Sequence, residues 1–145
     1  MKIIHIKYTC SILLLALFSC NSKEAVPIKI NIDQCDFCKM KISDSQFAAE
    51  AVTDKGRIYK FDDIRCMISY TNENKLNIFN FYVSSFTKTN TLINTKEAIF
   101  LTGDLFSSPM RGNIAAFNSR DDASKFQQET NVAPILWSEI LNNFK

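Results

Sequence analysis

The chain has 145 residues and a formal net charge of +2, which suits one compact domain with a buried core and gives no basic footprint for nucleic acid. It contains no glycine-rich phosphate loop and no aromatic RNA-binding motif. Composition and charge therefore argue against a nucleotide-binding or nucleic-acid-binding function.

Residues 1–20 have the pattern of an export signal. Lys2 and Lys7 precede the apolar run "SILLLALFS", which would span about 14 Å as a helix, well short of a bilayer core of about 30 Å. The letters "LFSC" resemble the lipobox of bacterial lipoproteins, in which the cysteine is acylated; the alternative is an ordinary signal peptide with a chance cysteine. We predict a signal peptide at 1–19, a lipid anchor at Cys20, a flexible tether at 20–27 and a location in the cell envelope, facing the periplasm or exterior.

Cleavage after residue 19 would change the inventory of reactive side chains. The removed segment carries two lysines and no acid, so the formal charge of the remainder is 2 − 2 = 0. It also carries His5 and Cys10, so the mature chain has no histidine. Beyond the lipid-bearing Cys20, the remaining cysteines are Cys35, Cys38 and Cys66.

The first half of the mature chain predicts strands around one helix. The alternation in "IKINID" predicts a short strand with its isoleucines on one face. The runs "FAAEAVTD" and "RIYKFD" flank the turn signal "DKG" and predict a hairpin in which Gly56 takes a positive φ. "DDIRCMISYTNEN" predicts a helix capped by Asp62 or Asp63. "LNIFNFYVSSF" predicts a further strand, with one side formed by Phe79, Phe81 and Val83.

The second half repeats this order. "GRIYKF" at 56–61 and "GNIAAF" at 112–117 share GxIxxF, 112 − 56 = 56 residues apart, and each leads into an acid-rich helix start. A strand, "EAIFLTG", precedes the second copy, and a helix in "APILWSEILNNF" closes the chain, with Pro134 near its first turn and a buried stripe of Leu136, Trp137, Ile140 and Leu141. The predicted fold class is α+β: one compact domain at 28–145 built from two similar ββα(β)-type units, approximately 28–85 and 90–145, with a C-terminal helix.

The stretch "CDFCKM", residues 35–40, carries the most reactive side chains. Outside the cytoplasm, a CxxC pair is a disulfide, a redox-active pair or part of a metal site. Zinc is disfavoured because a structural zinc site takes four cysteine or histidine ligands, and the mature chain offers three free thiols and no imidazole. A thioredoxin-like site is unsupported because no sustained helical pattern follows the pair.

Met40 favours copper among these readings. A thioether is a poor ligand for zinc, magnesium or calcium, whereas it suits copper in the +1 state. One thiolate and two thioethers around Cu(I) have zero net charge, so such a site is compatible with partial burial. Methionine is also a common core filler, and a simple Cys35–Cys38 disulfide remains the competing interpretation.

Four motifs in order, the lipobox cysteine, "CDFCKM", "FDDIRCM" and "SPMRGNIAAF", resemble the NosL family of copper-binding lipoproteins, accessory factors for the assembly of nitrous oxide reductase. The resemblance implies a Cu(I) chaperone rather than an enzyme, anchored to a membrane and serving a copper-accepting client, nitrous oxide reductase or its assembly transporter. It also implies a fold of two similar ββαβ-type units. Matched by motif, the metal ligands are Cys35, Met40 and Met110, with Cys38 auxiliary. The alternative function is a structural or thiol-redox lipoprotein with a Cys35–Cys38 disulfide.

Two positions depart from the family pattern. Lys39 stands where glycine commonly precedes the first methionine, and Arg111 stands where glycine commonly follows the second. If these positions require a positive φ, both side chains are held under backbone strain.

The remaining chemistry-bearing residues are assigned to the fold. On the predicted helix, Met67 falls with the apolar stripe and is expected in the core. Cys66 lies about 100° away from that stripe, where a packed residue is preferred over an alternative thiol or a disulfide partner. Asp62 and Asp63 are expected to cap the helix rather than to form a catalytic pair.

Overall fold

The computed structural model describes residues 23–144. The described elements, in chain order, are strands β1 (Ala49–Thr53) and β2 (Ile58–Phe61), helix α2 (Ile64–Glu73), strands β3 (Ile78–Ser84), β4 (Leu92–Asn94), β5 (Ile99–Thr102) and β6 (Ile114–Phe117), and helices α3 (Arg120–Thr130) and α4 (Trp137–Asn143). The predicted signal peptide and the predicted lipid anchor at Cys20 lie outside the described residues. No helix within 23–144 has the length and apolar character needed to span a bilayer.

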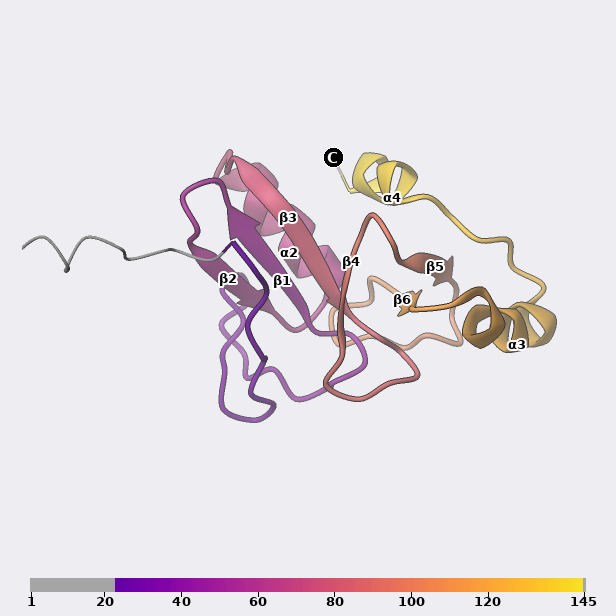
Figure 1. Cartoon of the computed structure of the whole chain (residues 1–145). Helices are drawn as coiled ribbons and strands as arrows, with labels where there is room; N and C mark the ends of the chain where they lie inside the picture. The colour runs from indigo at the N-terminus through magenta and orange to yellow at the C-terminus, as the bar shows by residue number, and fades with distance from the viewer. Residues whose placement is uncertain (1–22, 145) are drawn as a thin grey trace, which may run out of the picture.

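The first sheet is antiparallel, with strand order β2-β1-β3-β4. Helix α2 lies behind this sheet and the N-terminal segment crosses in front of it (Figure 1). The segment is attached there by the amide of Val26, which donates to the Glu50 carboxylate on β1 at 3.0 Å. Both faces of β1 are therefore covered, and all five of its residues are buried.

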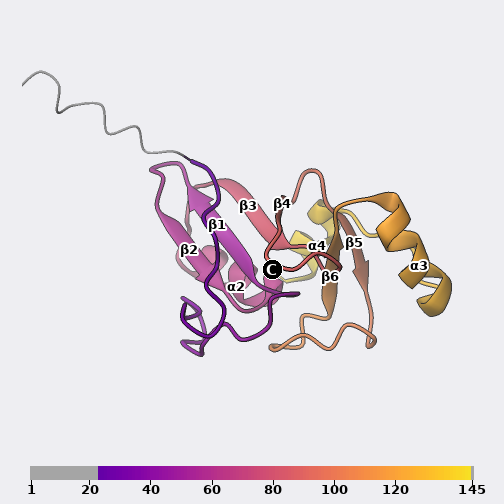
Figure 2. The same cartoon turned by 60° about the horizontal axis from the view of Figure 1, so that its bottom comes forward.

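The second unit is a two-stranded antiparallel sheet, β5-β6, with α3 beside it (Figure 2). The order strand, strand, helix thus occurs twice, as β1-β2-α2 and β5-β6-α3. The Ser85–Ala116 bridge links the end of β3 to β6. The predicted α+β class and the C-terminal helix are confirmed.

The local turn and cap predictions for the first unit are confirmed. The hairpin turn between β1 and β2 contains Gly56 at φ 76°. Asp63 is the N-cap of α2 and accepts the amide of Arg65 at 2.8 Å. Met67 is fully buried, as its place on the apolar stripe predicts.

The predicted strand at 28–33 is wrong. The segment is a turn, because Asn31 is left-handed at φ 63° and Asp33 accepts the amide of Lys29 at 2.8 Å. An aspartate side chain that bonds a nearby backbone amide offers the chain an alternative to a strand ladder. Ile32 consequently points to solvent, with 72% of its surface exposed.

Two apolar faces extend less far than predicted. Phe79, at the start of β3, is 45% exposed, whereas Val83 further along the same face is fully buried. Helix α4 begins at Trp137, and Leu136 before it is 68% exposed. Ile135 pairs with Phe100 instead of belonging to the helix, so the helix is shorter than predicted.

The buried side chains within residues 23–144 form two apolar clusters. The larger lies between the first sheet and α2, extends to residues of β5, β6 and α4, and includes Cys35 and Cys66. The smaller lies between the β5-β6 sheet and α3, where Phe86 contacts the rings of four other phenylalanines at centroid distances of 5.2–5.7 Å. The thiols therefore belong to the main core, at its edge beside the loops.

Candidate metal centre

Three sulfur atoms and one carboxylate converge at the start of α2. The Sγ atoms of Cys35, Cys38 and Cys66 and a carboxylate oxygen of Asp62 all lie within 4.8 Å of one another. Cys35 and Cys66 are 0% and 1% exposed, and Cys38 is half-buried. Two loop cysteines and two residues of the helix start thus form one cluster.

Residues 33–42, which we call the sulfur loop, fold back tightly on themselves. The amide of Cys35 donates to the Met40 carbonyl at 2.8 Å, and the amide of Lys39 donates to the Cys35 carbonyl at 3.0 Å. Lys39 closes this turn in the left-handed region at φ 65°. Asp36 fixes the loop to β2, because its carboxylate accepts the amide of Lys60 at 2.9 Å. The two cysteine sulfurs are therefore held against the helix start.

Residues 103–113, which we call the methionine loop, are held at the same place by Asp63. Its Oδ2 accepts the Ser108 hydroxyl at 2.6 Å, the Met110 amide at 3.0 Å and the Gly112 amide at 3.3 Å. Asp63 is 1% exposed, so these bonds are shielded from water. Met110 packs against the apolar cluster that contains Cys35.

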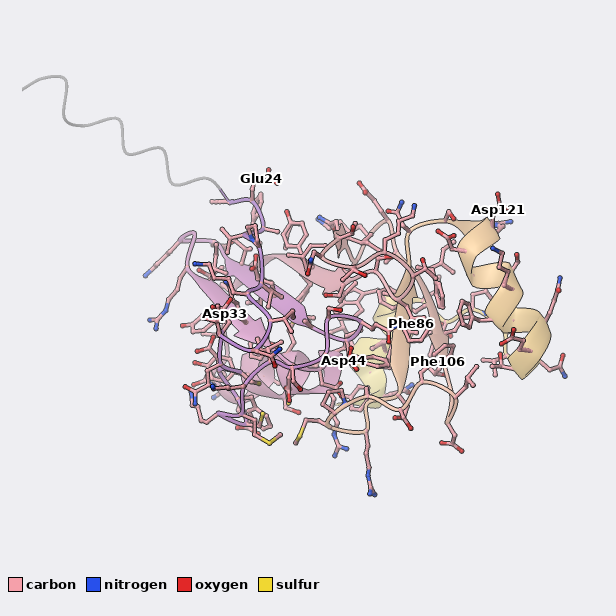
Figure 3. The ribbon with its side chains drawn as sticks, turned by 90° about the horizontal axis from the view of Figure 1, so that it is seen from below. Glu24, Asp33, Asp44, Phe86, Phe106 and Asp121 are labelled. Atoms are coloured by element: carbon pink, nitrogen blue, oxygen red, sulfur yellow. The ribbon has the colours of Figure 1, made fainter. Side chains whose placement is uncertain are left out.

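Adjacent carboxylates thus join the two loops. Asp62 accepts the Cys38 thiol at 3.5 Å, while Asp63 holds the methionine loop. Figure 3 shows yellow sulfur atoms gathered at one edge of the molecule, away from the labelled Glu24. Met40, in the same loop as Cys35 and Cys38, is 49% exposed.

The three thiols have different acidities. The Cys66 thiol donates a hydrogen bond to the Cys35 sulfur, and this bond, with the amides of Asp62 and Cys38, lowers the pKa of Cys35 to about 7 against the opposing effect of burial. Burial raises the pKa of Cys38 to about 11. The bond to Cys35 raises the pKa of Cys66. Cys35 is therefore the thiol that ionises first.

A metal ion fits the donors that converge here. Asp62 Oδ1 is buried without a hydrogen-bond partner among the described residues, although buried polar atoms are nearly always paired. A cation bound among the three sulfurs would give the Asp62 carboxylate a charged partner. Thiolates are soft donors suited to Cu(I) and zinc. Asp62 raises the number of donors to four, so the sequence-based argument against zinc, which counted only cysteine and histidine, was incomplete.

The structure brings together part of the predicted ligand set. Cys35 and Cys38 lie in the cluster, Met110 packs beside it, and Met40 follows in the same loop. Cys66, for which packing was preferred over a role as an alternative thiol, and Asp62, expected to cap the helix, both place donor atoms in the cluster. The position of Cys66 about 100° from the apolar stripe, on the side of Asp62, was the signal that pointed here. Cys35, Cys38 and Cys66 are all free thiols in the structure.

Both departures from the glycine pattern occur at left-handed positions. Lys39 has φ 65° and Arg111 has φ 56°. A side chain at such a position costs free energy that glycine does not. The two residues next to the methionines are therefore held in conformations for which glycine is the better residue.

Comparison with known proteins places the chain in a family. The NosL family model matches residues 27–142. Among solved structures, the crystal structure of the copper chaperone NosL from Shewanella denitrificans is similar, with a TM-score of 0.67 and 22% sequence identity over 81% of this chain and 96% of that chain. No curated protein sequence matches the chain. Because the family model covers most of its length, the chain belongs to the NosL family.

Proposed function

We propose that this protein is a copper chaperone rather than an enzyme, and that its cargo is Cu(I). The observation that carries the proposal is the convergence of three thiol sulfurs and one carboxylate within 4.8 Å, beside a loop that carries Met110. The described residues contain no histidine, so sulfur is the dominant donor type near this point. A sulfur-rich set without imidazole favours copper in the +1 state.

The proposed cargo site has an inner and an outer part. Cys35, with its lowered pKa, supplies the anionic donor, and Cys38 lies at the boundary between the core and solvent. Met40 and Met110 supply neutral thioethers on the outer side. When copper is held by two or three exchangeable ligands, a partner protein can add one of its ligands before the chaperone releases the metal. The copper then passes between the two proteins without entering water.

The proposal extends to the client and the location. The motif resemblance to NosL lipoproteins supports delivery of copper for the maturation of nitrous oxide reductase, and the Shewanella protein named as a copper chaperone is consistent with a carrier role. We further propose that Cys20 is acylated and holds the domain on an envelope membrane, facing the periplasm or exterior. Mass spectrometry of the protein extracted from its native envelope tests this part through the mass of the N-terminal peptide.

Competition with bathocuproine disulfonate tests copper binding in the reduced protein. We expect one Cu(I) per chain and weaker binding of zinc under the same conditions. Met40→Leu and Met110→Leu are each expected to weaken Cu(I) binding by about tenfold or more while leaving the copper-free protein nearly as stable, since the two side chains have similar volumes. Cys35→Ser is expected to weaken it most. Zinc binding equal to or tighter than Cu(I) binding would contradict the proposal.

Counting free thiols distinguishes the copper chaperone from the alternative, a structural or thiol-redox protein with a Cys35–Cys38 disulfide. Two residues between Cys35 and Cys38 close a very small ring, which stabilises a protein little. Protein alkylated directly in the envelope is expected to carry three modified cysteines within residues 23–144. A Cys35–Cys38 disulfide that persists through mild reduction would favour the structural or thiol-redox function instead.

A further inference from the structure

Exposed cations flank the soft donors of the site. Lys39 and Lys41 stand on either side of Met40, Arg65 precedes Cys66, and Arg111 follows Met110. All four side chains are exposed, and the Arg65 guanidinium donates to the Met110 carbonyl at 3.3 Å, so both loops and the helix start contribute. We call Lys39, Lys41, Arg65 and Arg111 the cationic collar.

The collar is not neutralised from within the described part of the chain. The ion pairs there are Lys60–Asp33 and Lys88–Asp122, neither of which involves a collar residue. Among the nearby carboxylates, Asp63 accepts the amides of the methionine loop, Asp36 accepts the amide of Lys60, and Asp62 lies in the sulfur cluster. The exposed collar side chains therefore form no ion pair within residues 23–144.

Two collar residues occupy strained backbone positions. The described residues other than glycine with positive φ are four asparagines, which tolerate that region, and the three cations Lys39, Lys75 and Arg111. Lys75 lies just beyond the end of α2, where its amide bonds the Asn72 carbonyl, and a left-handed residue commonly closes a helix in this way. Lys39 and Arg111 close turns within the two loops, through amide bonds to the carbonyls of Cys35 and Ser108. Backbone strain of this kind clusters at functional sites, and here it occurs beside both methionines.

We infer that the cationic collar docks a carboxylate-rich protein surface that surrounds the metal site of the copper partner. The inference rests on the proposed copper function and specifies the partner's chemistry. A partner that exchanges copper must bring its own donor atoms to the sulfur loop, where Met40 is half exposed. A lipid surface has no such donors, so a protein fits better than an anionic membrane.

The expected effect is on docking and on the rate of transfer. Complementary charges around a site accelerate encounter by about 10- to 1,000-fold at low ionic strength, and salt removes most of this gain. The collar residues are next in sequence to the sulfur-bearing Met40, Cys66 and Met110. A partner that docks on the collar therefore also has its own metal ligands aligned with these sulfur atoms.

Two synthetic peptides serve as probes. Both contain the same reduced Cys-Gly-Gly-Cys copper-binding core, flanked by glutamates in one and by lysines in the other. Calorimetry measures their binding to the copper-free protein, and stopped-flow absorbance measures the transfer of Cu(I) from the loaded protein. The parent is expected to bind the acidic peptide at low salt at least about tenfold more tightly than the basic one, and to transfer copper to it faster by a similar factor.

The test variant is a double substitution, Lys39→Gly together with Arg111→Gly, and the control variant is Lys75→Gly. Each replaces an exposed cation at a positive φ by glycine, so each relieves backbone strain and is expected to raise the melting temperature. The double variant is expected to lose at least about tenfold in binding of the acidic peptide, whereas Lys75→Gly is expected to stay within about twofold of the parent.

Because calorimetry uses the copper-free protein, it tests the docking inference independently of copper binding. Failure to bind Cu(I) would reject the proposed function, while the calorimetric comparison would still decide whether the collar recognises carboxylates. Equal binding of the two peptides, or an equal loss in Lys75→Gly, would overturn the inference. Anionic phosphatidylglycerol vesicles provide a third probe, and preference of the collar for these vesicles over the acidic peptide would also overturn it.

Discussion

Asp63 accepts a hydrogen bond from the backbone amide of Met110 at 3.0 Å, across 47 residues of sequence. The same carboxylate caps α2 through the amide of Arg65. One buried side chain therefore sets the helix that carries Cys66 and the loop that carries Met110. The relative position of the two loops at the metal site depends on this residue.

Asp63→Asn is expected to release the methionine loop while keeping the helix cap. Asparagine is as good an N-cap as aspartate, but its amide nitrogen cannot accept the hydrogen bonds that Oδ2 accepts from Ser108, Met110 and Gly112. We expect a loss of roughly 2–3 kcal/mol in the free energy of unfolding and a weaker Cu(I) affinity. Chemical denaturation and chelator competition measure the two effects.

A double-mutant cycle identifies the cause of the affinity loss. If Asp63 acts by placing Met110, then Asp63→Asn adds little to the loss in Met110→Leu. Gly112→Ala should behave like Asp63→Asn, because an added Cβ would collide with Asp63 Oδ1. Fully additive losses in Asp63→Asn and Met110→Leu would contradict the positioning role.

Cys66 is expected to act mainly as a hydrogen-bond donor to Cys35. A serine hydroxyl can replace that donor, so Cys66→Ser is expected to stay within about threefold of the parent in Cu(I) affinity, whereas Cys66→Ala is expected to lose more. Chelator competition on the two variants compares them directly. Equal, large losses in both would instead identify the Cys66 sulfur as a copper ligand.

Local patterns predicted the elements that need only near neighbours. The hairpin at Gly56 and the capped helix at Asp63 follow from turn and cap residues whose bonding partners lie within a few positions. A local contact also explains why the strand predicted at 28–33 was wrong. The hydrogen bond from the Lys29 amide to the Asp33 carboxylate favours a turn over the strand that the alternating isoleucines predicted.

The site depended on contacts that no local pattern contains. Spacing alone grouped Cys35 with Cys38, and the family resemblance added Met110. Nothing in the sequence required Cys66 and Asp62 to place donor atoms beside them, since that contact is created by packing the sulfur loop against α2. The sequence therefore grouped the loop cysteines but not the helix residues beside them, and the identity of the metal ligands stays a prediction.

Glu50 makes the stability of the fold depend on pH. Burial raises the pKa of this fully buried carboxyl to about 7, and its Oε2 has no hydrogen-bond partner within residues 23–144. The folded state thus favours the protonated form, so the stabilisation is complete below the unfolded pKa near 4.5 and is lost as the pH rises to about 7. Glu50→Gln is expected to remove this decline in the free energy of unfolding, which is on the order of 3 kcal/mol. Chemical denaturation near pH 4.5 and near pH 7 measures the decline in the parent and in the variant. An unchanged pH profile would count against it.

The phenylalanine cluster of the second unit is expected to stabilise the fold without touching the metal site. Phe117 is 0% exposed and packs against the Phe86 and Phe126 rings. Phe117→Ala is expected to cost about 3–5 kcal/mol, whereas Phe79→Ala, at a side chain that is 45% exposed, should cost far less. Thermal unfolding of the two variants checks this difference, and similar losses would refute the assignment of the core.

The central claim is that both loops supply sulfur to one Cu(I) ion. X-ray absorption at the copper K-edge, recorded on the reduced, Cu(I)-loaded protein and on Met110→Leu, measures this directly through the number and type of atoms bound to copper. The account predicts a shell dominated by sulfur in the parent and the loss of one sulfur in Met110→Leu. A shell dominated by nitrogen or oxygen, or an identical sulfur shell in the parent and in Met110→Leu, would contradict it.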